Sequence, residues 1–393
     1  MKDIVLVSAC RTPIGAFRGT LSSLAAPKLG AVTVREAIDR ASLHNEDVDE
    51  VIMGNVLSAG VGQAPARQAA IFSGLPTSVQ CMTVNKVCGS GLKSVMLASQ
   101  AIALDDAEVV VAGGMESMSN APYLLEKART GYKMGNAELV DSMIKDGLLN
   151  VYNNSLMGEA AELCARECQV PREAQDEFAV LSYKRAQDSQ RTGRFSKEIV
   201  SVEVQDGKGE KSVVHVDEEP SRADFAKFPK LKPVFMKDGT VTAANSSTIN
   251  DGAAAMVIMS VQKAKKLGVR PIAKIIGQAS YAKDPMWFTT APADVIRKVL
   301  ERTKLAVKDI DLFEINEAFA VVVNAVNKIL DLDVNKVNVN GGAVALGHPI
   351  GASGARILVT LLHALEQRNL KRGIAAICIG GGEASAVIVE RMD

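Results

Sequence analysis

The stretch Cys88-Gly-Ser-Gly-Leu-Lys-Ser-Val-Met-Leu-Ala-Ser-Gln-Ala-Ile102 decides the fold, because a similar stretch follows 263 positions later. The second stretch runs from Gly351 to Leu365 and reads Gly-Ala-Ser-Gly-Ala-Arg-Ile-Leu-Val-Thr-Leu-Leu-His-Ala-Leu. In both, a turn rich in glycine and serine leads into an apolar pattern of helical period. Two helices that begin in the same way predict that the chain contains the same supersecondary unit twice.

Two strand-like runs repeat in nearly the same register. The run that begins at Val48 resembles the run at Ile310, 262 positions later, and the run at Glu108 resembles the one at Ile374, 266 positions later. Strand-like runs alternate with helical patterns, which is typical of an α/β fold with a mainly parallel sheet. We therefore predict two similar α/β domains that face each other across a pseudo-twofold axis.

The stretch between the two repeats has no counterpart in this scheme. Residues 118–249 are rich in methionine, lysine and arginine and contain a polar segment at 206–211. We predict an inserted loop domain there, between an N-terminal α/β domain of residues 1–117 with about 250–269 and a C-terminal α/β domain of residues 270–393. Insertions near a domain interface often carry a lid or ligand-binding loops.

The composition argues against several classes of protein. Lysine and arginine total 45, aspartate and glutamate also total 45, and aromatic residues make up 4% of the chain. A nucleic-acid-binding surface needs clustered positive charge and aromatic rings for base stacking, so none is expected. No apolar run approaches the roughly 18 residues of a membrane span. We expect partners that are small molecules, with no nucleic acid and no membrane.

Six cysteines, at positions 10, 81, 88, 164, 168 and 378, show no spacing typical of a disulfide framework or a metal site. Free cysteines fit a reducing compartment. The apolar run at 4–7 is too short for the core of a signal peptide. We therefore expect a cytoplasmic protein, and a processed mitochondrial form is also compatible with the sequence.

Cys88 follows a strand-like run and precedes Gly-Ser-Gly at the start of a predicted helix. The free N–H groups and the dipole of a helix N-terminus stabilise a thiolate, so we expect the pKa of this thiol to be lowered. A reactive nucleophile and a buried structural cysteine before a tight turn both fit this segment taken alone. The run from Gly89 also resembles a dinucleotide-binding GxGxxG motif, but its last glycine is replaced.

Three further polar residues lie in the second half, at predicted strand ends or in a glycine-rich loop. His348 stands between a glycine and a proline, where a general base or an oxyanion donor is a more natural role than a core side chain. Cys378 closes an apolar run just before three glycines, and Asn316 follows another apolar run. Because ligands bind at the carboxyl ends of strands in α/β sheets, we expect these groups to meet Cys88 at the domain interface.

Four segments, in their order along the chain, resemble the signature blocks of the thiolases. They are Val87-Cys-Gly-Ser-Gly, Asn316-Glu-Ala-Phe, Gly347-His-Pro and Cys378-Ile-Gly-Gly-Gly. The likeness runs along essentially the whole chain and is greatest to the short-chain acetoacetyl-CoA thiolases, also called acetyl-CoA acetyltransferases. It implies duplicated α/β domains in five layers, α-β-α-β-α, with an inserted loop domain. It also implies a reversible Claisen condensation of two acetyl-CoA to acetoacetyl-CoA and CoA through an acyl-cysteine intermediate.

The resemblance implies a division of roles among the polar residues. Cys88 is expected to be the nucleophile that takes the acyl group, and His348 the acceptor of its proton. Cys378 is expected to be the acid and base at the methyl carbon of acetyl-CoA, with the enolate oxygen held by His348 and by a water at Asn316. The N–H groups of Cys88 and Gly380 are expected to hold the oxygen of the acyl thioester.

The same resemblance places coenzyme A largely against the insertion. The expected substrate-binding residues are Leu148, Leu156, Met157, Tyr183, Arg222, Lys227, Ala243, Ser247, Phe288, Ala318 and Phe319. Arg222 and Lys227 suit the nucleotide phosphates. Leu156 stands where relatives usually have histidine, and Phe288 where many bacterial relatives have methionine. The preference for the acyl chain is therefore the open part of this prediction.

The segments at 230–235 and 239–245 resemble the mitochondrial, potassium-activated branch of the family. The expected potassium ligands are a tyrosine hydroxyl and backbone carbonyl groups, at Tyr183, Ala243, Ala244, Ser246 and Val344. Oxygen ligands of this kind suit a hard ion, while a loop ordered by protein contacts alone is the alternative. The resemblance implies no tightly bound cofactor, coenzyme A as substrate and product, and a homotetramer built as a dimer of dimers.

Other functions fit the sequence less well. A thiolase of broader chain length in fatty-acid degradation is the alternative within the family. A nicotinamide oxidoreductase would need a complete dinucleotide-binding motif, and a non-catalytic carrier of acyl-CoA would have no need of Cys88 or Cys378. A ketoacyl synthase would be expected to have a second histidine motif in place of Asn316-Glu-Ala-Phe.

Overall fold

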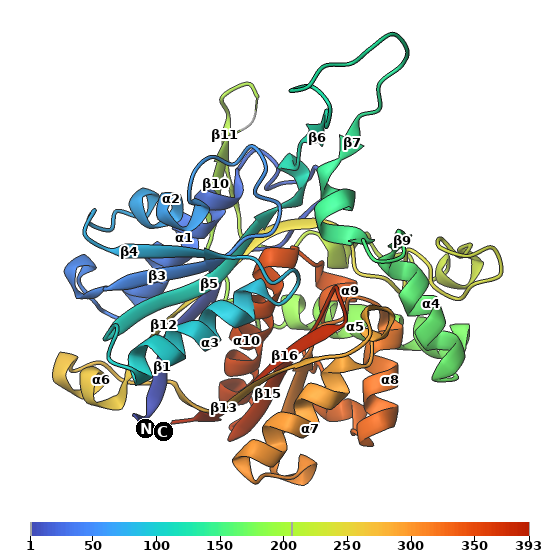
Figure 1. Ribbon diagram of the computed structural model, residues 1–393. Coiled ribbons are helices and arrows are strands. Elements are labelled where there is room, and N and C mark those ends of the chain that lie inside the picture. Colours follow the sequence, from blue (N-terminus) through green and yellow to red (C-terminus); the bar gives the residue numbers. More distant parts are fainter. Residues whose placement is uncertain (1, 206, 393) are drawn as a thin grey trace.

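The computed structural model describes residues 2–205 and 207–392, which form two similar halves and an insertion. The strands of the N-terminal half are β1 (Ile4–Arg11), β2 (Gly15–Ala16), β3 (Glu50–Gly54), β4 (Gln80–Val84), β5 (Val109–Ser117) and β12 (Asn250–Ser260). Those of the C-terminal half are β13 (Ala273–Ala282), β14 (Leu312–Ile315), β15 (Arg372–Ile379) and β16 (Glu383–Arg391). Together they form one ten-stranded sheet in the order β14-β15-β16-β13-β1-β12-β5-β3-β4, with β2 beside β12 (Figure 1).

The two halves of the sheet meet where β1 pairs with β13, through only two residue pairs. On each side of this junction the strands follow the same order, so that β12, β5 and β3 correspond to β16, β15 and β14. The expectation of a mainly parallel sheet is wrong, because among the described strands of this sheet only the pairs at its two ends, β3–β4, β3–β5 and β14–β15, are parallel. The chain turns directly from β15 into β16 as a hairpin, and such a short connection requires antiparallel strands.

Helices cover both faces of the sheet and fill the space between its halves. The N-terminal half contributes α1 (Ala26–Arg40), α2 (Pro65–Phe72), α3 (Ser90–Ala103) and α6 (Val261–Leu267). The C-terminal half contributes α7 (Ala291–Thr303), α8 (Ala320–Leu330), α9 (Ala343–Leu346) and α10 (Ile350–Gln367). Helices α1 and α2 pack on one outer face and α7 on the other, while α3 and α10 pack on each other in the middle (Figure 1). The layers are therefore α-β-α-β-α, as expected.

The central helices touch through glycines that occupy equivalent positions in the two repeats. A Cβ atom on Gly91 would lie 2.8 Å from the backbone nitrogen of Ala355, and one on Gly354 would overlap with the backbone nitrogen of Leu92. Each glycine therefore faces the residue that follows its counterpart, which is the reciprocal contact that a twofold axis produces. Both repeats have glycine at this position because the two backbones cross there without side chains between them.

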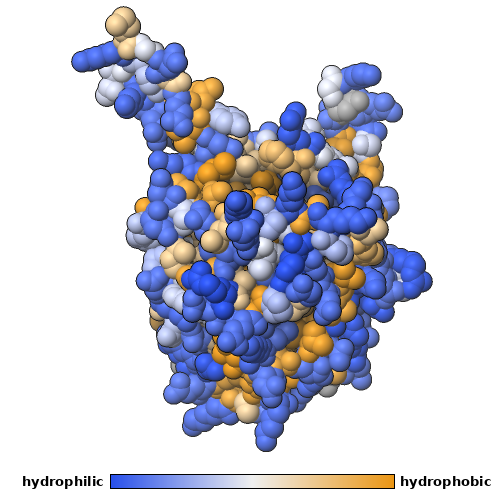
Figure 2. Space-filling model, turned by 90° about the vertical axis from the view of Figure 1, so that its right-hand side faces the viewer, coloured by the Kyte–Doolittle hydropathy of each residue, from blue (hydrophilic) through white to orange (hydrophobic). Residues whose placement is uncertain are grey.

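The insertion leaves the sheet after β5 and returns at β12. Its main helices are α4 (Met157–Glu167) and α5 (Arg172–Arg191), which pack on α8 of the C-terminal half. Its strands form three separate two-stranded ribbons: β6 (Tyr123–Leu124) with β7 (Val140–Asp141), β8 (Leu149–Asn150) with β9 (Ser155–Leu156), and β10 (Val202–Gln205) with β11 (Lys211–Val214). The β6–β7 arm stands clear of the body of the molecule (Figures 1 and 2).

A fully buried arginine fastens the insertion to the first strand. Arg11 of β1 donates to Glu198 at 2.6 Å and to Asp217 at 2.6 and 2.9 Å. A buried charge of this kind is tolerated only when it is paired and hydrogen-bonded, as it is here. Over the described ranges 2–205 and 207–392, no helix has the length and apolar character needed to cross a membrane.

Candidate active site

Cys88 lies in the tight turn between β4 and α3. The hydroxyl of Ser90 accepts a hydrogen bond from the Lys86 N–H at 2.8 Å and donates one to the Val87 carbonyl at 2.6 Å. Val87 has φ of 45°, a conformation that a β-branched residue rarely adopts, so the turn holds some backbone strain directly before the cysteine. Gly89 allows the turn to approach Ile379, since a Cβ atom there would overlap with the Ile379 side chain.

The pKa of Cys88 differs from the sequence-based expectation. Burial raises it to about 11, and the N–H groups of Gly380 and of Cys88 itself oppose this rise only in part. The expected lowering is therefore wrong, because removal of the thiolate from water outweighs the nearby backbone dipoles. At neutral pH the resting group is a thiol, which needs a base before it can act as a nucleophile.

His348 has an unpartnered ring nitrogen, and it lines the same cavity as Cys88. Its backbone N–H donates to Asn250 Oδ1 at 2.9 Å, and its Nδ1 lies 2.6 Å from Ser353 Oγ. Ser353 donates its only hydroxyl hydrogen to the Pro349 carbonyl at 2.9 Å, so it must accept from an Nδ1–H of the imidazole. The buried Nε2, which has no partner, is then the atom with a free lone pair.

The imidazole is neutral in the resting protein. Burial, and to a smaller extent the charge of Arg356, lower the pKa of His348 to about 3. A neutral imidazole whose Nε2 is unprotonated can accept a proton, and it becomes an Nε2–H donor once it has done so.

Cys378 and Asn316 are buried and do not line the cavity that Cys88 and His348 share. Cys378 ends β15, is 1% exposed, and packs in one cluster with Phe288, Ala318 and Phe319. Burial, and then the neighbouring Cys88, raise its pKa, so this group is also a thiol at rest. Asn316 follows β14 and is fully buried, and neither atom of its side-chain amide has a partner. An unpaired buried amide costs free energy, which suggests that it is kept for a ligand or a water.

The residue after Asn316 fixes this strand end against its neighbours. The carboxylate of Glu317 accepts hydrogen bonds from the Ser182 hydroxyl at 2.7 Å, the Asn338 amide at 2.8 Å and the Val344 N–H at 3.0 Å. It thereby connects β14 with α5 and with the glycine-rich loop that leads to His348.

A cavity of about 290 Å³ opens beside Cys88, His348 and Gly380. Of the expected substrate-binding residues, the structure brings seven to its wall: Leu148, Leu156, Met157, Ser247, Phe288, Ala318 and Phe319. Most of the lining is apolar, as is usual for a pocket that takes an elongated organic ligand. The insertion and the C-terminal half therefore enclose the space in front of the two catalytic candidates.

Four expected substrate-binding residues do not line this cavity. Tyr183 is buried in another cluster, and Ala243 is exposed. The exposed Arg222, at the end of a 3₁₀ turn, forms ion pairs with Glu218 and Glu219, and the exposed Lys227 pairs with Asp224. The charges that would suit phosphate groups therefore lie outside the apolar cavity.

The residues expected to bind potassium are brought together only in part. Tyr183, Ala244 and Val344 belong to one buried cluster, and burial raises the pKa of Tyr183 to about 12. Ser246 donates its hydroxyl to the Thr242 carbonyl at 2.7 Å.

Several residues that shape the site carry no sequence signal of their own. Met118, Met143 and Phe235 line the cavity. Only the general richness of the insertion in methionine pointed toward Met118 and Met143, and Phe235 was part of a segment that resembled the potassium-activated branch without an expected role of its own. The buried Glu116 accepts from the Gly351 N–H at 2.8 Å and from the Asn55 amide at 2.6 Å, and so ties β5 to the start of α10. Burial raises its pKa to about 7.

The duplicated five-layer fold, with a cysteine and a histidine before its two central helices, defines the thiolase class of proteins. This chain belongs to the thiolase family: residues 4–262 match the N-terminal thiolase domain, and residues 269–391 match the C-terminal thiolase domain. The resemblance stated from the sequence is thus confirmed.

Individual relatives are similar over their full length. The acetyl-CoA acetyltransferase of Schizosaccharomyces pombe is 52% identical over 391 residues, 99% of each chain. The Bacillus anthracis acetyl-CoA acetyltransferase has a TM-score of 0.98 and 41% identity, and the comparison covers 100% of this chain and 99% of that one. The Acat5 thiolase from Ascaris suum, solved in complex with coenzyme A, has a TM-score of 0.94 and 46% identity over 100% of both chains. These structures confirm the expected fold class.

Proposed function

We propose that the protein is an acetyl-CoA acetyltransferase, which interconverts two molecules of acetyl-CoA with acetoacetyl-CoA and CoA. Relatives of that name are about half identical to it over the whole chain. The observation that carries the proposal is the pairing on one cavity wall of a thiol, the Gly380 N–H and a neutral imidazole with a free Nε2. A broader-chain thiolase has no observation of its own in its favour.

The first half-reaction transfers an acetyl group to Cys88. Its Sγ attacks the thioester carbonyl while Nε2 of His348 takes the thiol proton, which makes up for the raised pKa. The N–H groups of Gly380 and Cys88 hold the oxygen on which negative charge develops, and donors of this kind typically contribute about 3–4 kcal/mol. The leaving CoA thiolate takes a proton from Cys378, which becomes a thiolate.

The second half-reaction forms the carbon–carbon bond. The Cys378 thiolate removes a proton from the methyl group of a second acetyl-CoA, and the resulting enolate attacks the acetyl group on Cys88. The enolate oxygen accepts from Nε2–H of His348 and from a water held by the Asn316 amide. As acetoacetyl-CoA forms, the Cys88 thiolate leaves and takes its proton back from His348, so every proton is accounted for.

One assay tests the reaction directly. Acetoacetyl-CoA is mixed with the protein, with and without free CoA, and its absorbance is followed. Thiolysis requires the CoA thiol as the second substrate, so we expect consumption only when CoA is present. Consumption at the same rate without CoA would mean hydrolysis and would contradict the proposal.

The phosphates of coenzyme A are proposed to lie toward Arg222 and Lys227, outside the apolar cavity. Both side chains are exposed and can turn from their present carboxylate partners to a ligand. Removal of the 3′-phosphate from CoA should then raise its KM in the wild type more than in the double variant Arg222→Gln, Lys227→Gln.

The β6–β7 arm is proposed to join a second copy of the chain in a homotetramer. Its apolar side chains have few contacts with the body, and Tyr123 is 65%, Leu139 64% and Met134 fully exposed. Side chains of this kind on a projecting arm are typical of a contact surface. Replacement of Met134 and Leu139 by serine should reduce the molar mass measured by light scattering from that of a tetramer to that of a dimer.

Activation by potassium remains a proposal with a simple test. The Tyr183 hydroxyl and neighbouring carbonyl groups are hard oxygen ligands that suit an alkali cation, which would order the coenzyme-binding loop. Activity should be higher in potassium chloride than in sodium chloride at equal ionic strength, and Tyr183→Phe should abolish the difference. Equal rates for the wild type in both salts would remove the idea.

A further inference from the structure

We propose that Glu162 is a positioning residue for coenzyme A, because its buried carboxylate holds the loop at 234–247 in the shape that closes one side of the cavity. The inference rests on the proposed function, since it takes coenzyme A as the occupant of the cavity. Glu162 lies on α4, one and a half turns beyond the two cavity-lining residues Met157 and Gly158.

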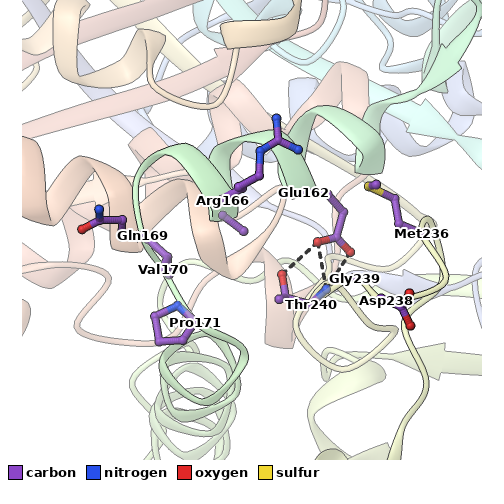
Figure 3. Close-up of a pocket in the computed structure, with 10 residues that line it drawn as sticks. Glu162, Arg166, Gln169, Val170, Pro171, Met236, Asp238, Gly239 and Thr240 are labelled. Carbon is purple, nitrogen blue, oxygen red and sulfur yellow. Dashed lines mark hydrogen bonds between the residues drawn. The ribbon is translucent and has the colours of Figure 1, made fainter.

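The carboxylate is fully engaged by the middle of the loop (Figure 3). It accepts from the Thr240 N–H at 2.8 Å, from the Thr240 hydroxyl at 2.9 Å and from the Val241 N–H at 2.8 Å. Glu162 is 5% exposed, and a buried carboxylate is tolerated only when its hydrogen-bonding capacity is met. Gly239 allows this approach, because a Cβ atom there would overlap with the carboxylate.

The part of the loop that precedes this contact places an aromatic side chain, Phe235, on the wall of the cavity. The Val234 N–H donates to the Val241 carbonyl at 3.0 Å, which closes the loop and turns Phe235 inward. Phe235 lines the cavity and packs edge to face on Phe319, with ring centroids 6.0 Å apart. It also covers Gly158, where a Cβ atom would overlap with the ring. The position of Phe235 therefore depends on α4 and on the loop together.

On the other side the loop delivers two serines. The Asn245 amide donates to the Thr240 carbonyl at 3.1 Å and to Asp176 at 2.8 Å. These two hydrogen bonds fix the position of Asn245 relative to Thr240, which Glu162 holds. Ser246 and Ser247 line the cavity, and Ser247 donates its N–H and its hydroxyl to the Ala318 carbonyl, at 3.0 and 2.9 Å. Glu162 thus holds the midpoint between two cavity-lining segments, although it does not touch the cavity itself.

The contact between Glu162 and the loop affects substrate binding without involving the residues that hold Cys88 and His348. Cys88 and His348 are held by Ser90, Asn250 and Ser353, none of which contacts Glu162. Loosening of the 234–247 loop should therefore weaken coenzyme A binding and leave the nucleophile in place.

The test measures binding without turnover, by protection of Cys88 from iodoacetamide. Coenzyme A in the cavity blocks the thiol, so the CoA concentration that halves the alkylation rate, followed by peptide mass spectrometry, reports binding. We expect Glu162→Gln to raise this concentration about tenfold, because glutamine keeps one acceptor oxygen and turns an NH₂ group toward the Thr240 N–H. In steady-state thiolysis the KM for CoA should rise similarly, while kcat falls less than threefold.

A matched control lies on the same helix. Glu167→Gln changes an exposed carboxylate that pairs with Arg166, so the half-protecting concentration, the KM for CoA and kcat should all stay within twofold of the wild type. If Glu162→Gln does not fold, Thr240→Val removes the hydroxyl alone and should raise the half-protecting concentration about threefold.

Two outcomes would overturn the inference. One is a folded variant whose half-protecting concentration stays within twofold of the wild type. The other is an alkylation rate without CoA that changes as much as the protection does, since that would mean a general loosening of the protein. A wild type that is protected by CoA but does not consume acetoacetyl-CoA would contradict the proposed function. The comparison of CoA protection between Glu162→Gln and the wild type would still test the role of Glu162.

Discussion

The first turns of the two central helices use the same serine for different purposes. Ser90 at the start of α3 and Ser353 in the first turn of α10 occupy equivalent positions of the two repeats. The lone pair of Ser90 receives a backbone N–H, from Lys86, whereas that of Ser353 receives the Nδ1–H of His348. One half therefore uses the serine to hold a turn that presents Cys88, and the other uses it to orient an imidazole. Duplication supplied the scaffold, and the two halves differ in the group that each turn presents.

The largest effect is expected where the first turn presents its thiol. Cys88→Ser should lower acetyl transfer by at least about 1,000-fold, because a serine hydroxyl is a far weaker nucleophile than a cysteine. Mass spectrometry after mixing with acetyl-CoA should find an acetyl group on the wild type and none on the variant. Acetylation that persists on another cysteine of the variant would show that the two turns have been assigned the wrong roles.

Cys378 offers a second thiol outside both turns. Cys378→Ser should still become acetylated at Cys88, at a rate within about threefold of the wild type, because the CoA thiolate can leave before it is protonated and can take its proton from water instead. Condensation should fall about 1,000-fold, since a hydroxyl cannot take the proton of the methyl group at neutral pH. Quenched-flow measurement of the acetyl-enzyme, beside steady-state synthesis, separates the two steps. Equal losses in both steps would contradict the division of labour.

The raised pKa of Cys88 predicts how its reactivity depends on pH. With a pKa of about 11, the thiolate fraction should rise about tenfold for each pH unit between 7 and 9, or about 100-fold in all. The rate of alkylation by iodoacetamide without CoA follows that fraction. A plateau between pH 8 and 9 would instead indicate a thiolate stabilised by the helix N-terminus.

The two serines themselves give the sharpest test of the comparison. Ser353→Ala should lower kcat about 10- to 30-fold with little change in KM, because the imidazole loses the partner that keeps its hydrogen on Nδ1. Nitrogen NMR of labelled histidine should show the mixed tautomers directly. Ser90→Ala should leave the tautomer of His348 unchanged and lower the free energy of unfolding by about 1 kcal/mol, since the part-buried Lys86 N–H loses its acceptor.

The smallest effect concerns the acyl end of the cavity. Phe288 and Leu156 both line it, and an apolar wall favours an extra methyl group by about 0.8 kcal/mol, or fourfold. We expect kcat/KM for 2-methylacetoacetyl-CoA within about tenfold of that for acetoacetyl-CoA. Phe288→Met and Leu156→His should each shift the ratio of the two values against the branched substrate. An unchanged ratio in both variants would show that these side chains do not select the substrate.

The repeat and the site differ in how far the sequence could predict them. The register between residues 88–102 and 351–365 is local and strong, so the two similar α/β halves followed from it, whereas the five layers followed from the resemblance to the thiolases. The direction of β12 and β16 did not follow, because a repeat shows that strands recur and not which way they run. The pKa of Cys88 was predicted in the wrong direction, since the helix start is visible in the sequence and the burial is not.

Residues that act across long distances in the chain carried no local signal. Glu116 and Asn250 reach the site from separate strands, and their partners Gly351 and His348 lie far away in the sequence. Arg222 was expected at the coenzyme A phosphates from the resemblance, and its place outside the apolar cavity, in an ion pair with Glu218, could not be predicted from the sequence. The chemistry of a side chain can be read from the sequence, whereas its distance to the cavity depends on tertiary packing.

The contact between Gly91 and Gly354 acts as a mechanical stop. Backbone meets backbone there, so no rotamer change can absorb compression, and the two central helices cannot approach each other more closely. Cys88 lies three residues before Gly91, and His348 lies six residues before Gly354. The spacing between thiol and imidazole therefore depends on this contact. Substitutions in the outer helical layers can accumulate with little effect on that spacing.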